Sequence, residues 1–118
     1  MTTTEAAAGQ ERPLRRSRPG RGIVVARNLA DLHGPVSGVV ELPLYLFWSS
    51  PDRTFDLADP VMRGLMYEKV LCEARSFDDL ATYLDGLTLA AIWPQLLLPR
   101  DVRHVWELRH PALGRAAA

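Results

Sequence analysis

The sequence is poor in the residues that build covalent frameworks and metal centres. Its 118 residues include one cysteine, Cys72, and three histidines that lie far apart, His33, His104 and His110. One cysteine excludes a disulfide framework within the chain, and the whole set is too sparse for a Cys/His zinc site. We therefore expect no metal and no cofactor, and we interpret Cys72 as a partly buried structural thiol.

Long apolar segments are also missing. A membrane-spanning helix needs about 18 consecutive apolar residues, whereas the apolar segment at residues 93–98 is short and is interrupted by Pro94 and followed by Pro99. The N-terminal residues include arginines but no apolar stretch of the kind that secretory signals contain. These absences favour a cytoplasmic protein that does not enter a membrane.

Neither sign of charge dominates the chain. Fourteen basic residues balance fourteen acidic ones and the isoelectric point is near 6.8, which excludes a uniformly basic nucleic-acid binder. The distribution is uneven, because residues 1–27 contain six arginines and two glutamates while the remainder contains eight basic and twelve acidic residues. The acidic remainder suits a partner with a basic cleft, such as an enzyme that handles RNA or nucleotides.

The first 22 residues form a separate segment by composition. Apart from Met1, Leu14 is their only large apolar side chain, so the segment cannot bury enough surface to offset its ordering entropy and is predicted to be a disordered arm. It is either an ordinary solvated leader or a basic arm that neutralises nucleic-acid phosphates. The second interpretation assigns that weak binding to the arginines at Arg12, Arg15, Arg16, Arg18 and Arg21.

Residues 23–113 are predicted to form a single, mostly α-helical domain. About half of the whole chain is hydrophobic, at 47%, which suffices for a core. The sequence predicts short helices at about residues 26–33, 43–48, 60–74, 76–84, 87–93 and 100–109, and an extended stretch at 39–42. We find no convincing sheet.

The best-defined helix begins after Asp59, a good N-cap that is followed by Pro60 at the first helical position. Its apolar positions are expected to face the core; they are Val61, Met62, Leu65, Met66, Val70 and Leu71. Ser76 and Asp79 resemble a capping box for the next helix, whose expected buried residues are Phe77, Leu80, Ala81 and Leu84. The helix at 87–93 is apolar nearly all round and is expected to be buried.

Two functional classes have little support in the sequence. The helices at 77–84 and 87–93 have the lengths of a helix-turn-helix, but the second one has no Arg, Lys, Asn or Gln to contact base edges. The chain also has no G-x-S-x-G motif, no H-E-x-x-H motif and no glycine loop for phosphates. We therefore expect neither a sequence-reading helix nor an enzyme.

A dense apolar segment at residues 42–48 is the strongest indication of a partner. The expected contacts are Leu42, Tyr45, Phe47 and Trp48, with the acidic Asp52 and Asp56 around them. One short helix cannot enclose so many large side chains in its own core, and aromatic residues often anchor interfaces. Alternatively, residues 60–110 wrap around the segment completely; the sequence leaves both possibilities open.

Several motifs resemble those of small actinobacterial proteins that are encoded beside nucleotidyltransferase toxins of the abortive-infection type and are often labelled transcriptional regulators. The motifs are N-L-A-D-L-H-G at 28–34, V-V-E-L-P at 39–43, F-D-L-A-D-P at 55–60, M-Y-E-K-V-L-C-E-A at 66–74, D-L-A-T-Y-L-D at 79–85, I-W-P-Q-L-L-L-P at 92–99 and V-W-E-L-R-H-P at 105–111. The resemblance covers about residues 27–113 and excludes the arginine-rich arm.

The resemblance implies an antitoxin that binds the toxin and blocks nucleotide transfer to tRNA without being an enzyme itself. The chain lacks a Gly-Ser followed by an Asp-x-Asp or Asp-x-Glu pair, with which such toxins hold metal and triphosphate, so it resembles the partner and not the toxin. Two alternatives stay open: a small DNA-binding regulator that uses the basic arm, as a monomer or a homodimer, and a structural subunit of a larger assembly.

Overall fold

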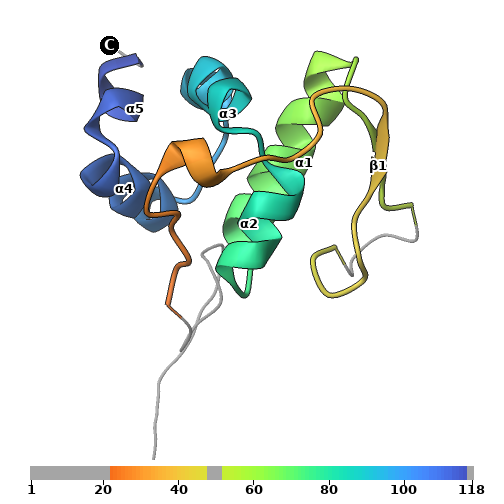
Figure 1. Ribbon diagram of the computed structural model, residues 1–118, viewed down its shortest axis with the longest axis horizontal. Coiled ribbons are helices and arrows are strands. Elements are labelled where there is room, and N and C mark those ends of the chain that lie inside the picture. Colours follow the sequence, from red (N-terminus) through yellow and green to blue (C-terminus); the bar gives the residue numbers. More distant parts are fainter. Residues whose placement is uncertain (1–21, 48–51, 117–118) are drawn as a thin grey trace, which may run out of the picture.

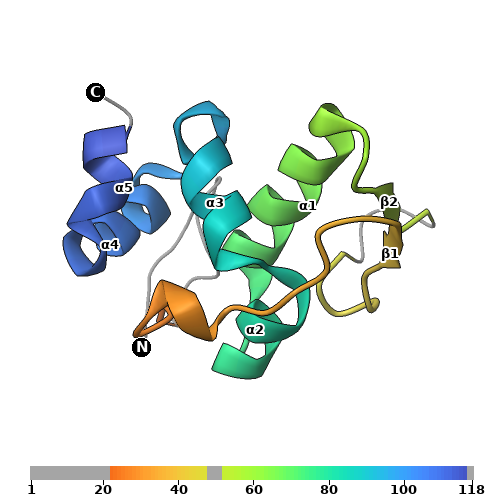
Figure 2. The same cartoon turned by 45° about the horizontal axis from the view of Figure 1, so that its top comes forward.

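The computed structural model describes residues 22–47 and 52–116 and is mostly helical, as predicted. Within these residues there are five α-helices, a two-stranded sheet and two short 3-10 helices. Their bounds are η1 Leu29–Asp31, β1 Val39–Glu41, β2 Thr54–Asp56, α1 Pro60–Glu73, α2 Phe77–Tyr83, α3 Gly86–Ile92, η2 Trp93–Gln95, α4 Arg100–Arg109 and α5 Pro111–Ala116. The strands lie at one end, α4 and α5 lie at the other, and α1, α2 and α3 lie between them (Figures 1 and 2).

Helix α1 begins as the sequence predicts. The Asp59 side chain accepts a hydrogen bond from the Val61 amide (2.9 Å), and Pro60 occupies the first turn. The buried residues are Met66, Tyr67, Val70 and Leu71, and α1 packs against α2 and β2. The prediction that Val61 and Leu65 are buried is wrong, because they are 69% and 48% exposed.

The two strands correct the prediction that the chain has no sheet. They pair antiparallel, with Val40 opposite Phe55, and the Leu42 amide donates to the Arg53 carbonyl beyond the strand (2.9 Å). Phe55 and Leu42 are 4% and 0% exposed. The pairing therefore fixes the dense apolar segment over the helical core.

Two other helix predictions need correction. Residues 26–33 contain only the single 3-10 turn of η1, and the described part of 43–48 makes one turn, in which the Leu46 amide donates to the Pro43 carbonyl (3.0 Å). Both Leu42 and Leu46 are fully buried, so one turn suffices to place them. Helix α5, which begins at Pro111, is not among the predicted helices; a proline is well tolerated in a first helical turn.

Helices α2 and α3 are also less buried than predicted. Leu80, Leu84 and Leu89 are fully buried, whereas Phe77 is 41% and Leu87 is 85% exposed. Helix α3 packs against η1 and α5. Leu87 lies on a side of α3 that these elements do not cover. Among the residues that the structure describes, no helix has the length and apolar character needed to cross a membrane.

The segment around Gly34 is held against the joint between α2 and α3 by backbone hydrogen bonds. The Gly34 amide donates to the Leu84 carbonyl (2.7 Å) and the Gly86 amide to the Leu32 carbonyl (3.3 Å). A Cβ at Gly34 would lie 2.4 Å from the Tyr83 backbone, and one at Gly86 would meet the Leu29 carbonyl oxygen. Close backbone approach thus requires glycine at both positions.

A pair of tryptophans lies in the part of the core beside α4. Trp93 and Trp106 are fully buried, with ring centroids 6.2 Å apart. Trp93 Nε1 donates to Glu107 (2.9 Å), and the Arg103 guanidinium lies over the Trp93 ring at 5.0 Å. These contacts join η2 to α4, whose bounds match the predicted helix at 100–109.

Substituting Gly86 by alanine is expected to lower the free energy of unfolding by about 2 kcal/mol or more, because the new methyl group would meet backbone that cannot rotate away. Gly64→Ala is the matched control, since its Cβ would lie 4.0 Å from Leu96. That change in a helix interior is expected to stabilise the protein by up to about 1 kcal/mol. Urea denaturation of both variants checks this; equal effects would contradict the close-approach argument.

Candidate partner-binding site

The structure separates the residues of the predicted contact segment. Leu42 is fully buried in the chain's own core, so the prediction that it contacts a partner is wrong. Tyr45 is 38% exposed. Phe47 is half-buried between α1 and the hairpin that β1 and β2 form. Trp48 lies outside the described residues, as do Arg12, Arg15, Arg16, Arg18 and Arg21 of the predicted arm. Leu42 and Leu46 are thus enclosed by the rest of the chain, whereas Leu44, at 60%, and Tyr45 are exposed.

The two acidic residues of that prediction are exposed but take part in local turns. Asp52 accepts hydrogen bonds from the Thr54 amide (3.0 Å) and hydroxyl (2.6 Å), which lower the pKa of its carboxyl group. Asp56 accepts from the Ala58 amide (3.0 Å). Both carboxylates shape the ends of β2 and still contribute negative charge to the hairpin end of the molecule.

Tyr45 is tied to α2 by a buried carboxylate. Its hydroxyl donates to Asp79 (2.5 Å), which is 7% exposed and also accepts from the Arg75 amide (2.8 Å). The hydrogen bond to Asp79 is the main reason that the pKa of Tyr45 rises to about 12. The Arg75 guanidinium lies over the Tyr45 ring at 4.6 Å. Asp79 therefore joins the 43–47 turn to α2, instead of forming the capping box predicted with Ser76, whose side chain makes no cap bond among the described residues.

An exposed apolar surface lies instead on α1. Val61 and Leu65 lie one helical turn apart on its outer side, and Leu97, in the link from η2 to α4, is 82% exposed. We call Val61, Leu65 and Leu97 the α1 ridge. A hollow lies on each side of α1, and both hollows share Leu65 and Glu68 in their lining.

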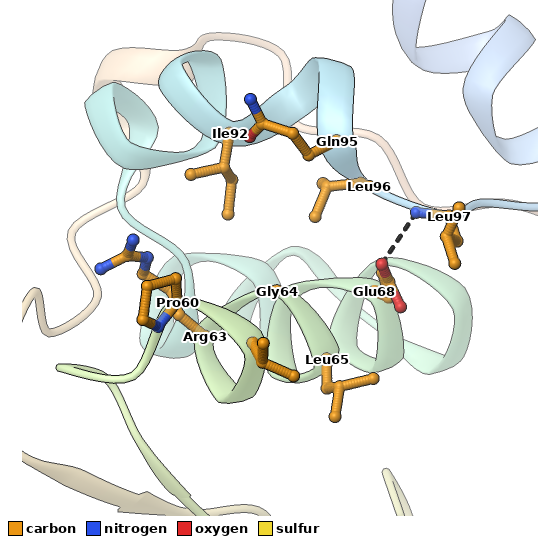
Figure 3. Close-up of a pocket in the computed structure, with 10 residues that line it drawn as sticks. Pro60, Arg63, Gly64, Leu65, Glu68, Ile92, Gln95, Leu96 and Leu97 are labelled. Carbon is orange, nitrogen blue, oxygen red and sulfur yellow. Dashed lines mark hydrogen bonds between the residues drawn. The ribbon is translucent and has the colours of Figure 1, made fainter.

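The first hollow lies between α1 and the segment from α3 to Leu97 and has a volume of about 420 Å³ (Figure 3). It is lined by Pro60, Val61, Arg63, Gly64, Leu65, Glu68, Ile92, Gln95, Leu96 and Leu97. Gly64 keeps the floor low because it has no side chain. The Leu97 amide donates to Glu68 across one end (2.8 Å), and Arg63 donates to the Leu57 carbonyl (3.1 Å). The charged tips are thus already hydrogen-bonded, which leaves a largely apolar surface.

The second hollow, of about 290 Å³, lies between α1 and the hairpin. Its walls include Phe47 and Phe55, whose ring centroids are 5.7 Å apart, and Lys69 lies over the Phe47 ring at 5.0 Å. Cys72 lines the same hollow and is half-buried. Phe47 is therefore the part of the predicted contact segment that reaches the α1 surface.

The ridge and its hollows were missed at the sequence level because the α1 pattern predicted one wide buried stripe. The exposure of Val61 and Leu65 depends on which of the other elements cover α1, which local periodicity does not specify. Among the described residues, no group of three His, Cys, Asp or Glu side chains is arranged to hold a metal ion.

No family model, no curated protein and no solved structure matches this chain.

Removing the Tyr45 hydroxyl in Tyr45→Phe is expected to lower the free energy of unfolding by about 1 kcal/mol, because Asp79 loses one of its donors. Urea denaturation measures the change. Tyr83→Phe is the control, since within the described residues the Tyr83 hydroxyl makes no hydrogen bond, and it is expected to be near neutral. A larger loss in Tyr83→Phe than in Tyr45→Phe would contradict this account of Asp79.

Proposed function

We propose that this chain is a non-enzymatic protein that binds another protein through the α1 ridge. The observation that carries the proposal is that exposed Val61, Leu65 and Leu97 lie beside two adjoining apolar hollows. Contiguous exposed apolar surface next to concave sites is typical of protein-binding faces. The occupant is an apolar segment of a partner, with side chains that enter the hollows on both sides of α1.

The charge of this chain indicates which residues should surround the apolar segment of the partner. The described residues include nine basic and twelve acidic side chains, and the hairpin end beside α1 displays exposed Glu41, Asp52, Asp56 and Asp59. A basic surface on the partner would be attracted to this end and would be oriented there. An apolar segment flanked by basic residues therefore fits the α1 ridge best.

The finer proposal is an antitoxin, on the basis of the sequence resemblance. Its partner is a nucleotidyltransferase toxin that acts on tRNA, whose cleft must be basic to hold RNA and triphosphate. An acidic protein that seats on such a cleft, or on the RNA-binding surface next to it, prevents the substrate from entering. No chemistry by the chain's own side chains is needed for that inhibition.

Replacing leucines of the ridge tests where the partner binds. The chain is co-expressed with the product of the neighbouring gene, and the complex is measured by size-exclusion chromatography with light scattering and by titration calorimetry. Leu65→Ser and Leu97→Ser are each expected to weaken binding at least tenfold, or by about 1.4 kcal/mol.

The control is Leu108→Ser on α4, a leucine on a different helix whose exposure of 68% lies between those of Leu65 and Leu97. It is expected to leave the affinity unchanged. Equal losses in all three variants, or no loss in the ridge variants, would contradict the α1 site. A neighbour that binds tightly but has no nucleotidyltransferase activity would keep the partner-binding proposal and overturn the antitoxin proposal.

A further inference from the structure

Two arginines that are far apart in the sequence line one hollow on another part of the surface. Arg27 precedes η1, and Arg109 is the last residue of α4, yet both line a hollow of about 410 Å³ together with Val25, Asp31 and Phe77. Among the described residues, no ion pair or hydrogen bond occupies either guanidinium group. The hollow does not share a residue with the two hollows beside α1.

A hydrogen bond explains why the two arginines meet. His110 Nε2 donates to the Ala26 carbonyl (2.6 Å), and His110 is itself packed against Trp106, with ring centroids 5.6 Å apart. Arg27 follows Ala26 and Arg109 precedes His110, so this one contact brings both arginines to the same hollow. In both views the segment that leads to η1 lies between α4 and α2 (Figures 1 and 2).

The hollow also has an aromatic wall. Phe77, the first residue of α2, is 41% exposed although it is large and apolar. Guanidinium groups bind phosphates, and an exposed aromatic ring stacks on an unpaired base; sites for single-stranded nucleic acid combine these two features. The volume lies within the roughly 300–1,000 Å³ range of ligand sites. Asp31 offsets one of the positive charges and offers an acceptor for a base amino group.

We propose that Arg27, Arg109 and Phe77 form a binding site for single-stranded nucleic acid. The two guanidinium groups bind phosphates, and one unstacked base lies against the Phe77 ring. Single-stranded RNA and single-stranded DNA both offer phosphates and an unstacked base. A duplex offers phosphates only, because its bases are stacked and paired.

The test is fluorescence anisotropy of the full chain with labelled 12-nucleotide single-stranded RNA, single-stranded DNA of the same sequence, and the corresponding DNA duplex, over a range of salt concentrations. Single strands are expected to bind more tightly than the duplex. Phe77→Leu keeps an apolar side chain but removes the ring, and it is expected to weaken single-strand binding about tenfold. Since residues 1–22 contain no aromatic residue, such a loss reports on the folded site and not on the arm.

The double variant Arg27→Gln, Arg109→Gln is expected to reduce the salt slope of single-strand binding by about 1.4, or about 0.7 for each lost phosphate contact. Arg100→Gln is the matched control, because Arg100 is exposed at the other end of the same helix. Circular dichroism verifies that each variant is folded. An unchanged affinity in Phe77→Leu, an equal effect of Arg100→Gln, or no binding of the parent chain at micromolar concentration and low salt would overturn the proposal. A preference for RNA over DNA would identify a 2′-hydroxyl contact within the same site.

Discussion

The backbone contact between residues 32–34 and residues 84–86 positions most of the molecule. It joins an N-terminal segment with little secondary structure of its own to the joint between α2 and α3, through amide-to-carbonyl bonds that need no side chain. The approach is so close that a methyl group at Gly34 or Gly86 would meet backbone atoms. Asp85, between the bonded residues, also caps α3 through Thr88 and donates its amide to the buried Tyr67 hydroxyl. One joint therefore sets the direction of α3 and its position against α1.

Both candidate sites depend on this joint. The first hollow beside α1 has one wall on α3 and η2, so its width follows from where α3 begins. On the other side of the joint, the same N-terminal segment continues to Ala26, where His110 holds it against the end of α4. That contact brings Arg27 and Arg109 together. The α1 ridge and the hollow lined by Arg27 and Arg109, which we propose as binding sites, thus occupy separate surfaces.

Local signals in the sequence predicted much of the fold, and non-local contacts account for what they missed. Asp59 and Pro60 predicted the start of α1 correctly, and the helix predicted at 100–109 matches α4. The sheet was missed because each strand has only three residues and pairs across a long connection. Gly34 and Gly86 are 52 positions apart in the sequence, and both let two backbones meet. Periodicity within one segment contains no information about such pairs.

The same limit explains why the surface that we propose for a partner lies on α1, whereas the sequence predicted contacts at residues 42–48. The sequence showed correctly that the chain has more large apolar residues than one short segment can bury, but it could not show which would be enclosed. The hairpin and Asp79 fix residues 42–47 over the core, so Leu42 and Leu46 are covered and Tyr45 is held at the edge. Part of the apolar excess then remains on α1, where Val61 and Leu65 continue a pattern that the core does not use. Exposing those side chains to water is unfavourable, and a partner that covers them recovers that free energy upon binding.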